Sequence, residues 1–411
     1  MHEPGHTPEF MRLLIATVAL CATVGVAARA PGQQANLTRA QAVQTALERG
    51  TRLGVAAADT AVATAQLAVA RTFPNPTLTG SYSKSVPTQH FSAEFPIDLP
   101  GVRNLRGESA RLGLDAARLK YQLARATIAL DADTTYTHAL AAREHLVLSR
   151  RNALDGDSLL HMVQRRRDAG DASDMDVELA RVNAGQQANT AAADSLTLIS
   201  TLLDLQATLG ISSARLEVNA TDSLADPPAA PAPADTTLSE SAANLSLEAA
   251  GLTVRLQHRS IFSTPSLSVG FEHGDPSQPG ILPTFGLGIA IPVFDRNRGQ
   301  IALAEAEQMR ARAELALARV EARNEIAHAI RERENAVAKV ARDRVLVASA
   351  NQVAAMSLTA YREGAASLPN VLEAQRSTRE VLGQFIDDLA AAWVATAELR
   401  VLSLTSTTRL P

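Results

Sequence analysis

The organisation of the chain is decided by the stretch Phe73-Pro-Asn-Pro-Thr-Leu-Thr-Gly-Ser-Tyr82, which returns later as Phe262-Ser-Thr-Pro-Ser-Leu-Ser-Val-Gly-Phe271. Two further pairs of segments repeat in the same order, 138–144 with 328–334 and 170–180 with 364–374. Repeats that keep their order and nearly their spacing indicate a duplicated structural unit.

Each copy contains one very long helical segment, about 105–168 in the first and about 300–362 in the second. Both segments have almost no Gly or Pro and are rich in Ala, Leu, Arg and Glu, which favour helices. At ~1.5 Å per residue, about 60 residues form a rod roughly 90 to 100 Å long. Each rod ends at a glycine, Gly170 or Gly364, after which a second helix is expected to run back. The sequence therefore predicts two antiparallel helical hairpins, about 105–210 and about 300–404.

An apolar seam at heptad-like spacing is expected to hold these helices together. In the second copy it is predicted to contain Ile330, Val337, Val340, Val347, Ala354 and Tyr361. In the first copy it is predicted to contain Leu140, Val147 and Leu154, with His161 at the next step.

Two pairs of strand-like segments, about 76–97 and about 264–293, precede the rods. Leu267, Val269 and Phe271 alternate with Ser and Gly, which is the period of a strand with two unlike faces. Aromatic residues form only 3% of the chain but gather around these segments, as they do at lipid interfaces. We therefore expect four membrane strands, with soluble hairpins that rest on a helix as the alternative.

The first residues are expected to direct export. Arg12 precedes an apolar stretch from Leu13 to Ala28, which has the length of a signal-peptide core and ends in small residues. We expect a signal peptide over residues 1–28, with Met1 or, more suitably, Met11 as its start. Lipidation of Cys21 is not expected, because Leu20 before it is too large for a lipobox.

Composition excludes several classes of function. The net charge of -4 provides no basic field for nucleic acid, and the single cysteine excludes a disulfide framework and a multi-cysteine metal site. No other apolar run is expected to be long enough for a spanning helix, so any membrane span must consist of strands.

Four membrane strands cannot form a closed barrel alone, because every backbone donor and acceptor in lipid must be paired. The smallest usual membrane barrel has eight strands, and its interior is filled by side chains. Three copies would give twelve strands and an aqueous lumen, so we expect a homotrimer in outer-membrane lipid. The fold class is therefore mainly α with a β-barrel part, built from a duplicated helix–strand–strand–helix unit.

The expected division of the chain has five parts. They are the signal peptide at 1–28, the first repeat at 29–225, a Pro/Ala linker at 226–237, the second repeat at 238–404 and a tail at 405–411. The linker contains too many prolines to continue a helix and is typical of a semi-rigid connector.

The duplicated plan resembles the outer-membrane factors of tripartite efflux and type I secretion systems, the family named after the TolC channel. Within it, Ile291-Pro-Val-Phe-Asp-Arg-Asn-Arg-Gly299 is similar to the outer-membrane components of cobalt–zinc–cadmium and copper–silver efflux systems. Phe95-Pro-Ile-Asp-Leu-Pro-Gly101, with Arg103 and Arg106, resembles the same strand exit in the first copy. The strand-exit residues that carry the resemblance are Pro292, Phe294, Asp295, Asn297 and Gly299. The chain departs from the family at 238–259, where an opening helix looks shortened, and in lacking a lipidated cysteine.

The resemblance implies an exit duct that conducts cargo passively, with heavy-metal cations as the expected cargo. It implies a periplasmic adaptor and an inner-membrane transporter of the RND type as partners, and a helical part in the periplasm. It also places a gate at the hairpin turns, where acidic residues follow the turn glycine by six and nine positions. The corresponding residues are Asp176 and Leu179 after Gly170, and Asn370 and Glu373 after Gly364, with Asp174 nearby.

Carboxylates from three copies around a narrow opening would raise the local cation concentration. The gate candidates are Asp174, Asp176, Asn370 and Glu373. The candidates for closing the gate or contacting an adaptor are Arg165, Arg166, Arg167, Arg362, Gly170 and Gly364. Solvated charges at a helix end are the alternative, since exposed pairs contribute little.

No catalytic, cofactor or metal site is expected, because the histidines are dispersed and no phosphate-binding glycine loop precedes a helix. The protein is therefore not expected to be an enzyme. The alternatives are a soluble periplasmic coiled-coil scaffold or adaptor, an envelope enzyme with added helices, and an exit duct for drugs or for type I protein secretion.

Overall fold

The structure is a computed structural model that describes residues 35–213, 215–261 and 264–405. The expected signal peptide at 1–28, its start and cleavage site, and Cys21 lie outside the described residues.

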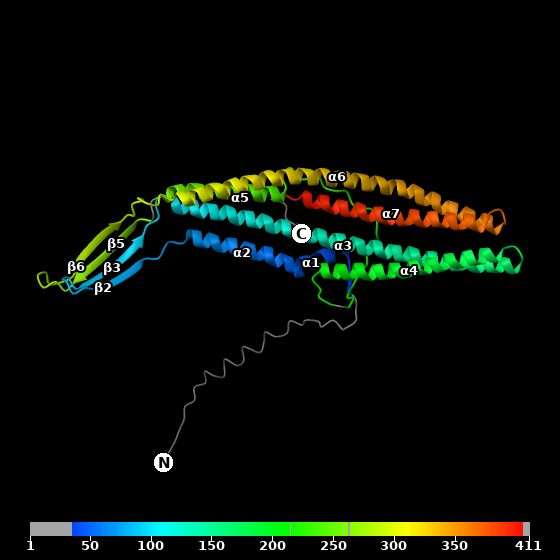
Figure 1. Ribbon diagram of the computed structural model, residues 1–411, viewed down its shortest axis with the longest axis horizontal. Coiled ribbons are helices and arrows are strands. Elements are labelled where there is room, and N and C mark those ends of the chain that lie inside the picture. Colours follow the sequence, from blue (N-terminus) through cyan, green and yellow to red (C-terminus); the bar gives the residue numbers. More distant parts are fainter. Residues whose placement is uncertain (1–34, 214, 262–263, 406–411) are drawn as a thin grey trace, which may run out of the picture.

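The first copy begins with a short strand and two helices, continues through a strand pair into a helical hairpin, and ends in a second short strand (Figure 1). Its elements are β1 (Ala35–Leu37), α1 (Arg39–Arg49), α2 (Thr51–Arg71), β2 (Thr77–Tyr82), β3 (Gln89–Pro96), α3 (Val102–Asp168), α4 (Asp174–Thr208) and β4 (Val218–Ala220). Strand β1 pairs in parallel with β4, so the start of the copy is tied to its end.

The second copy repeats this plan with one opening helix. Its elements are α5 (Leu238–Arg259), β5 (Ser266–His273), β6 (Leu282–Gly288), α6 (Arg298–Arg362) and α7 (Leu368–Leu402). The expected duplication and the two long hairpins are thus confirmed. Helix α3 has 67 residues and α6 has 65, so at ~1.5 Å per residue each is a rod of about 100 Å.

The helices form one elongated layer, with the strands at one end and the two hairpin turns at the other (Figure 1). Helices α2 and α4 follow one another along α3, while α5 and α7 follow one another along the groove between α3 and α6. The layer therefore has two free margins, one formed by α2 and α4 and the other by α6.

The four membrane-strand candidates form one antiparallel sheet in the order β2-β3-β5-β6. Its ladders are shorter than the segments expected from the sequence, because β5 begins only after Pro265 and gives residues beyond Gly288 no facing strand. Strands β2 and β6 are the open edges and run in opposite directions.

The register separates the residues of this sheet into two unlike faces. One face is apolar and consists of Leu78, Gly80, Phe91, Ala93, Phe95, Leu267, Val269, Phe271, Pro283, Phe285 and Leu287, with Tyr82, Gln89 and His273 at its outer end. Most of its large side chains are exposed; Leu78 is 80% and Phe285 78% exposed. The other face carries Ser, Thr, Gly, Glu94, His90 and Glu272, with Pro96 and Leu282 at its ends.

The buried seams of the long helices follow heptads of mostly small residues. They contain Leu119, Ala126, Asp133 and Leu140, then Ala142, Ser149, Gly156 and Val163 in α3, and Leu315, Ala322, Ala329 and Ala336 in α6. Val147 and Leu154 are 57% and 68% exposed, so the seam predicted for the first copy was wrong beyond Leu140. Exposed His161 is likewise outside the seam, and Ala336 is buried where Val337 was expected. The reason is that small residues let the helices approach closely, so larger apolar residues are left on the outer faces.

A buried polar cluster holds the two repeats of the chain together midway along the layer. Arg39 bonds to the Asp133 carboxylate and donates to Thr137 Oγ1 at 2.8 Å, and its guanidinium lies 3.9 Å from the Trp393 ring centroid. Tyr136 donates to the Asp222 carboxylate at 2.9 Å. Because these residues come from α1, α3, the segment after β4 and α7, the cluster fixes the lateral distance between the hairpins.

One helical stretch of the described chain, Leu53–Arg71 in α2, has the length and hydropathy of a spanning helix, and 6% of it is buried. The expectation that no second run would reach this level was wrong, because alanines raise its hydropathy. The stretch packs along α3 as part of the helical layer.

Candidate functional site

The first tip, the turn at Gly170, and the second tip, the turn at Gly364, have the same backbone motif. Gly170 and Gly364 have φ values of 86° and 76°, in the left-handed region that favours glycine. Asp171 N donates to Arg166 O at 2.8 Å, and Ala365 N donates to Ala360 O at 2.8 Å, which closes a Schellman cap on each rod. Both predicted turn glycines therefore end their helices and reverse the chain.

The acidic residues of the first tip serve the start of α4. Asp176 accepts from Ser173 N at 3.0 Å while Ser173 Oγ accepts from Asp176 N at 3.1 Å, which is a capping box. Asp174 is 92% exposed and lies 3.8 Å from Arg167, whose guanidinium also bonds to Asp168 at 2.6 Å. Asp176 is thus fixed by the cap, whereas Asp174 extends into solvent.

The second tip differs, because its N-cap Ser367 makes no side-chain cap bond. Asn370 is exposed and its backbone N donates to Ser367 O at 3.2 Å. Glu373 accepts from Arg376 through both carboxylate oxygens, at 3.0 and 2.8 Å. This bidentate pair holds the pKa of Glu373 below its usual range.

Arg166 joins the two tips. Its Nη1 donates to the Tyr361 carbonyl, and its guanidinium lies 4.7 Å from the Tyr361 ring centroid. Burial raises the pKa of the Tyr361 hydroxyl, Arg166 opposes that shift, and the Asp176 carboxylate adds to it. An apolar cluster from all four helices lies beside this contact and contains Leu159, Val163, Val177, Ala180, Tyr361, Leu368 and Val371.

The remaining arginines lie apart from the acids. Arg165 is exposed on α3, and Arg362 lines a groove between α3, α6 and α7 together with Arg151 and Asp155. Within the described chain, the structure brings one predicted arginine, Arg167, within 4 Å of a predicted gate acid, Asp174.

Three residues of the site were not singled out by sequence reasoning. They are Tyr361, expected only as a seam residue, Arg376, and Ser173. The spacing Ser173-x-x-Asp176 is a recognisable capping signal, and Arg376 follows Glu373 by one helical turn. The contact between Arg166 and Tyr361 joins distant parts of the chain and has no local signal.

The strand-exit motif fixes the entry into α6. The Asp295 carboxylate accepts from Asn297 N at 2.8 Å, and Asn297, with a φ of 57°, donates to Gln257 O at 2.8 Å. Phe294 is fully exposed beside this turn. In the first copy, Asp98 pairs with Arg106 at 3.0 Å and Arg103 stacks over Phe73. Both exits therefore attach the sheet firmly to the helices.

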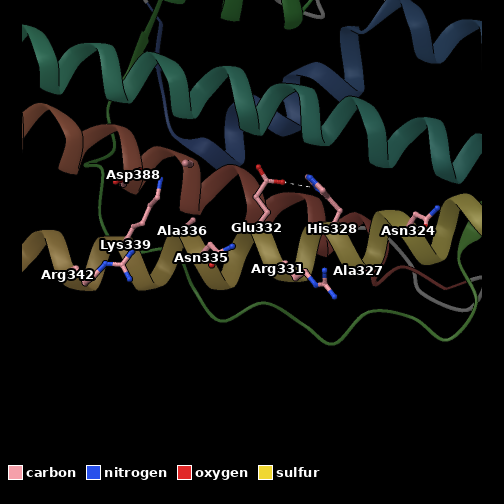
Figure 2. A pocket seen from close by; sticks show the side chains of 11 residues that line it. Asn324, Ala327, His328, Arg331, Glu332, Asn335, Ala336, Lys339, Arg342 and Asp388 are labelled. Carbon is pink, nitrogen blue, oxygen red and sulfur yellow. Dashed lines mark hydrogen bonds and ion pairs between the residues drawn. The ribbon is translucent and has the colours of Figure 1, made fainter.

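A groove with a volume of about 790 Å³ lies far from the tips, along α6 and α7 (Figure 2). Its charged side chains pair locally: His328 lies 3.2 Å from Glu332, and Lys339 lies 3.4 Å from Asp388. Within the described ranges, no three His, Cys, Asp or Glu side chains are grouped as metal ligands would be. The arrangement at the tips suits electrostatic control of an opening.

Comparison with known proteins gives a consistent result. A family model described as outer membrane efflux protein matches residues 42–211 and 241–403. The pyoverdine export outer membrane protein OpmQ of Pseudomonas putida is 27% identical over 315 residues, which cover 72% of this chain and 65% of OpmQ. The chain thus spans slightly less than two thirds of that relative.

Solved structures share the fold. A CusC structure, from work on its folding and transmembrane channel formation, matches with a TM-score of 0.75 and 20% identity over 89% of this chain and 91% of CusC. The Campylobacter jejuni CmeC outer membrane channel matches with a TM-score of 0.73 and 16% identity over 94% of this chain and 92% of CmeC.

Proposed function

The chain belongs to the outer membrane efflux protein family, and from this premise we propose that it forms the homotrimeric exit channel of a tripartite export system. The observation that carries the proposal is the register of the strand sheet. Its apolar face is exposed and its other face is polar, as in the wall of a membrane barrel with lipid outside and water inside.

The edges of the sheet support closure by other copies of the chain. Because β2 and β6 run in opposite directions, β6 of one copy can continue onto β2 of the next as another antiparallel pair. Two copies would give an eight-stranded barrel filled by side chains, whereas three give twelve strands around an aqueous lumen. Three is therefore the number that suits a channel.

The margins of the helical layer support the same assembly. On α2, Val55, Val62 and Val69 repeat every seventh residue and are 65%, 56% and 74% exposed. On α6, the exposed apolar side chains include Leu303, Met309, Leu317 and Val320. Apolar stripes on both free margins are suited to cover one another between neighbouring copies.

The location follows from the family and from the two ends of the molecule. The chain is an outer-membrane protein whose helical part lies in the periplasm. Aromatic residues at the two ends of the sheet, Tyr82 on one side and Phe73, Phe95 and Phe294 on the other, suit the two lipid interfaces.

The finer assignments are also part of the proposal. The family consists of channels and not of enzymes. The energy for export would therefore come from an inner-membrane transporter of the RND type, connected to the channel by a periplasmic adaptor. We propose heavy-metal cations as cargo, supported by the resemblance of the strand exit at 291–299 to components of metal efflux systems and by the carboxylates at the tips. The name of OpmQ makes a siderophore the second candidate cargo.

The division of the chain remains a proposal too. A mature first repeat at 29–225 and a second repeat at 238–404 would be joined by a linker at 226–237. Contacts support this linker: Asp226 pairs with Arg344, and Ala234 N donates to Leu402 O at 3.1 Å. The gate is proposed at Asp174, Asp176, Asn370 and Glu373.

The channel is tested with the purified mature chain. We expect a trimer in detergent by light scattering, a heat-dependent shift of its mobility in gels, and discrete conductance steps in planar bilayers. A chain that remains a water-soluble monomer without detergent would instead support the soluble scaffold.

The cargo is tested in cells that carry the channel with a matching adaptor and transporter. We expect cells without the channel to lose tolerance to cobalt, zinc, cadmium, copper or silver. Unchanged tolerance to all five metals, together with loss of siderophore secretion, would contradict the metal assignment.

A further inference from the structure

The four strands of the sheet contain acidic residues but no Lys or Arg. The acidic residues are Glu94 and Glu272. Both carboxylates lie on the polar face, because Glu94 faces Thr77 and Ser268 in the register and Glu272 faces His90 and Leu282. The apolar face has no carboxylate.

The two carboxylates differ in their surroundings. Glu94 is exposed, and no cationic side chain of residues 35–213, 215–261 or 264–405 lies within 4 Å of it. Glu272 is one third exposed and lies 3.2 Å from His90 Nδ1 on the neighbouring strand. Between the two carboxylates the polar face consists of small residues, and a Cβ added to Gly286 would lie 2.5 Å from Ser268 Oγ.

Lys and Arg side chains that neighbour the sheet in the sequence are at the ends of the strands rather than on the wall. Lys84 lies in the turn between β2 and β3. At the opposite end, Arg103 stacks on Phe73 and Arg106 pairs with Asp98. Within the strands, the imidazole of His90 beside Glu272 is therefore the one basic side chain on the polar face.

The reach of this field can be estimated for the proposed trimer, on which this inference rests. Twelve strands spaced ~4.8 Å apart and tilted by ~40° give a barrel about 24 Å across its backbone. Side chains narrow the diameter of the lumen to roughly 10 to 15 Å. The distance from the wall to the axis is half of this, which is shorter than the Debye length of about 8 Å at physiological ionic strength. Charges on the wall therefore act on ions at the axis.

We propose that Glu94 and Glu272 give the barrel a preference for hydrated cations and cationic cargo over anions, independently of the carboxylates at the helical tips. Three copies place six carboxylates on one lumen wall without any Lys or Arg between them. Their field concentrates cations in the lumen and lowers the density of anions. No ion has to be bound, so the preference acts during passage.

The test uses the full mature trimer in planar bilayers, with a KCl gradient and the reversal potential as the measurement. In about 0.1 M salt we expect the double variant Glu94→Gln with Glu272→Gln to lower the cation-to-anion permeability ratio at least ~2-fold. In about 1 M salt, where the Debye length is about 3 Å, the difference from the parent should largely disappear. Glu94→Lys should lower the ratio further than Glu94→Gln.

Glu248→Gln on α5 is the matched control, since it removes a carboxylate outside both the strands and the tips, and it should leave the ratio unchanged. An unchanged ratio in double-variant trimers of normal conductance would overturn the inference while leaving the channel intact. A parent chain that forms no trimer and no conductance would refute the proposed function itself. If the double variant fails to assemble, the two single variants are measured under the same criteria.

Discussion

Arg165 and Arg166 are neighbours in the sequence but have different environments at the tip. Arg166 points to the second hairpin and contacts Tyr361 through a hydrogen bond and its ring, whereas Arg165 stays exposed on α3. A guanidinium over an aromatic ring contributes ~0.5 to 2 kcal/mol, depending on its exposure. The contact is therefore strong enough to help hold the ends of the two hairpins together.

Replacing Arg166 should loosen the closed tip. We expect Arg166→Ala to raise the frequency of open-channel events in planar bilayers, because the link between the hairpins is lost. Arg166→Lys keeps the charge but not the planar group, so it should lie between the parent and the alanine variant. Arg165→Ala is the control, and an equal effect from it would show that only net charge matters.

A second prediction concerns the pH dependence of the tip. Arg376 lowers the pKa of Glu373, so Glu373 stays ionised to a lower pH than an ordinary glutamate and loses its charge only as the pH falls through that lowered value. In Arg376→Gln the pKa of Glu373 should rise back towards that of an ordinary glutamate, so the carboxylate is protonated at a higher pH.

The measurement is the cation preference of the channel between about pH 7 and pH 3, a window that spans the ordinary glutamate pKa. We expect the preference of Arg376→Gln to decline at a higher pH than that of the parent. Adding Glu373→Gln should remove this difference. If the double variant still declines like Arg376→Gln, another carboxylate is responsible.

At the scale of elements, each hairpin depends on one glycine between two long helices. An added Cβ at Gly170 would meet no atom within 4 Å, so the cost of a substitution there is conformational and not steric. For an L-residue the left-handed region costs roughly 1 to 2 kcal/mol. Glycine is therefore needed for the left-handed backbone conformation of the turn and not because neighbouring atoms leave no room for a side chain.

We expect Gly170→Ala to destabilise the trimer by about 1 kcal/mol per chain and to speed hydrogen exchange at the first tip. Gly185→Ala is the control, because Gly185 lies inside α4 and an added Cβ would also meet open space. It should stabilise the helix by about 0.5 to 1 kcal/mol. Equal effects of the two substitutions would contradict the role of the left-handed turn.

At the scale of the whole molecule, one chain leaves apolar surface uncovered on both margins and on the outer face of its sheet. Helix α2 ends near the strand end of the layer, and α6 begins at that same end on the opposite margin (Figure 1). In the proposed trimer, matching distances from that end would pair Val69 with Leu303, Val62 with Met309 and Val55 with Leu317 of neighbouring copies.

Cysteines at these pairs, introduced after Cys21→Ser, should form disulfides between copies. We expect at least one pair to give covalent trimers in a non-reducing gel of outer membranes. The control pair, Gly156→Cys with Ala184→Cys, should join α3 to α4 within a chain and leave monomer mobility, because an added Cβ at Gly156 lies 3.8 Å from Ala184 Cβ. Ladders beyond the trimer, or none from any pair, would contradict the closed assembly.

Local patterns determined much of this protein. The repeated Phe73 and Phe262 stretches predicted the duplication, the long stretches without turn residues predicted α3 and α6, and Gly170 and Gly364 predicted the turns. The alternation of the strands was also readable. Each of these features depends on residues close in the sequence, because helix propensity, chain reversal and strand period are local properties.

The tertiary structure decided what meets across the chain. The seam could not be read from large apolar residues, because close helix packing selects Ala142, Ser149 and Gly156 and exposes Val147 and Leu154. The contact between Arg166 and Tyr361 and the common face of Glu94 and Glu272 also depend on packing and strand register. These relations join residues far apart in the sequence, whose distance only the folded chain sets.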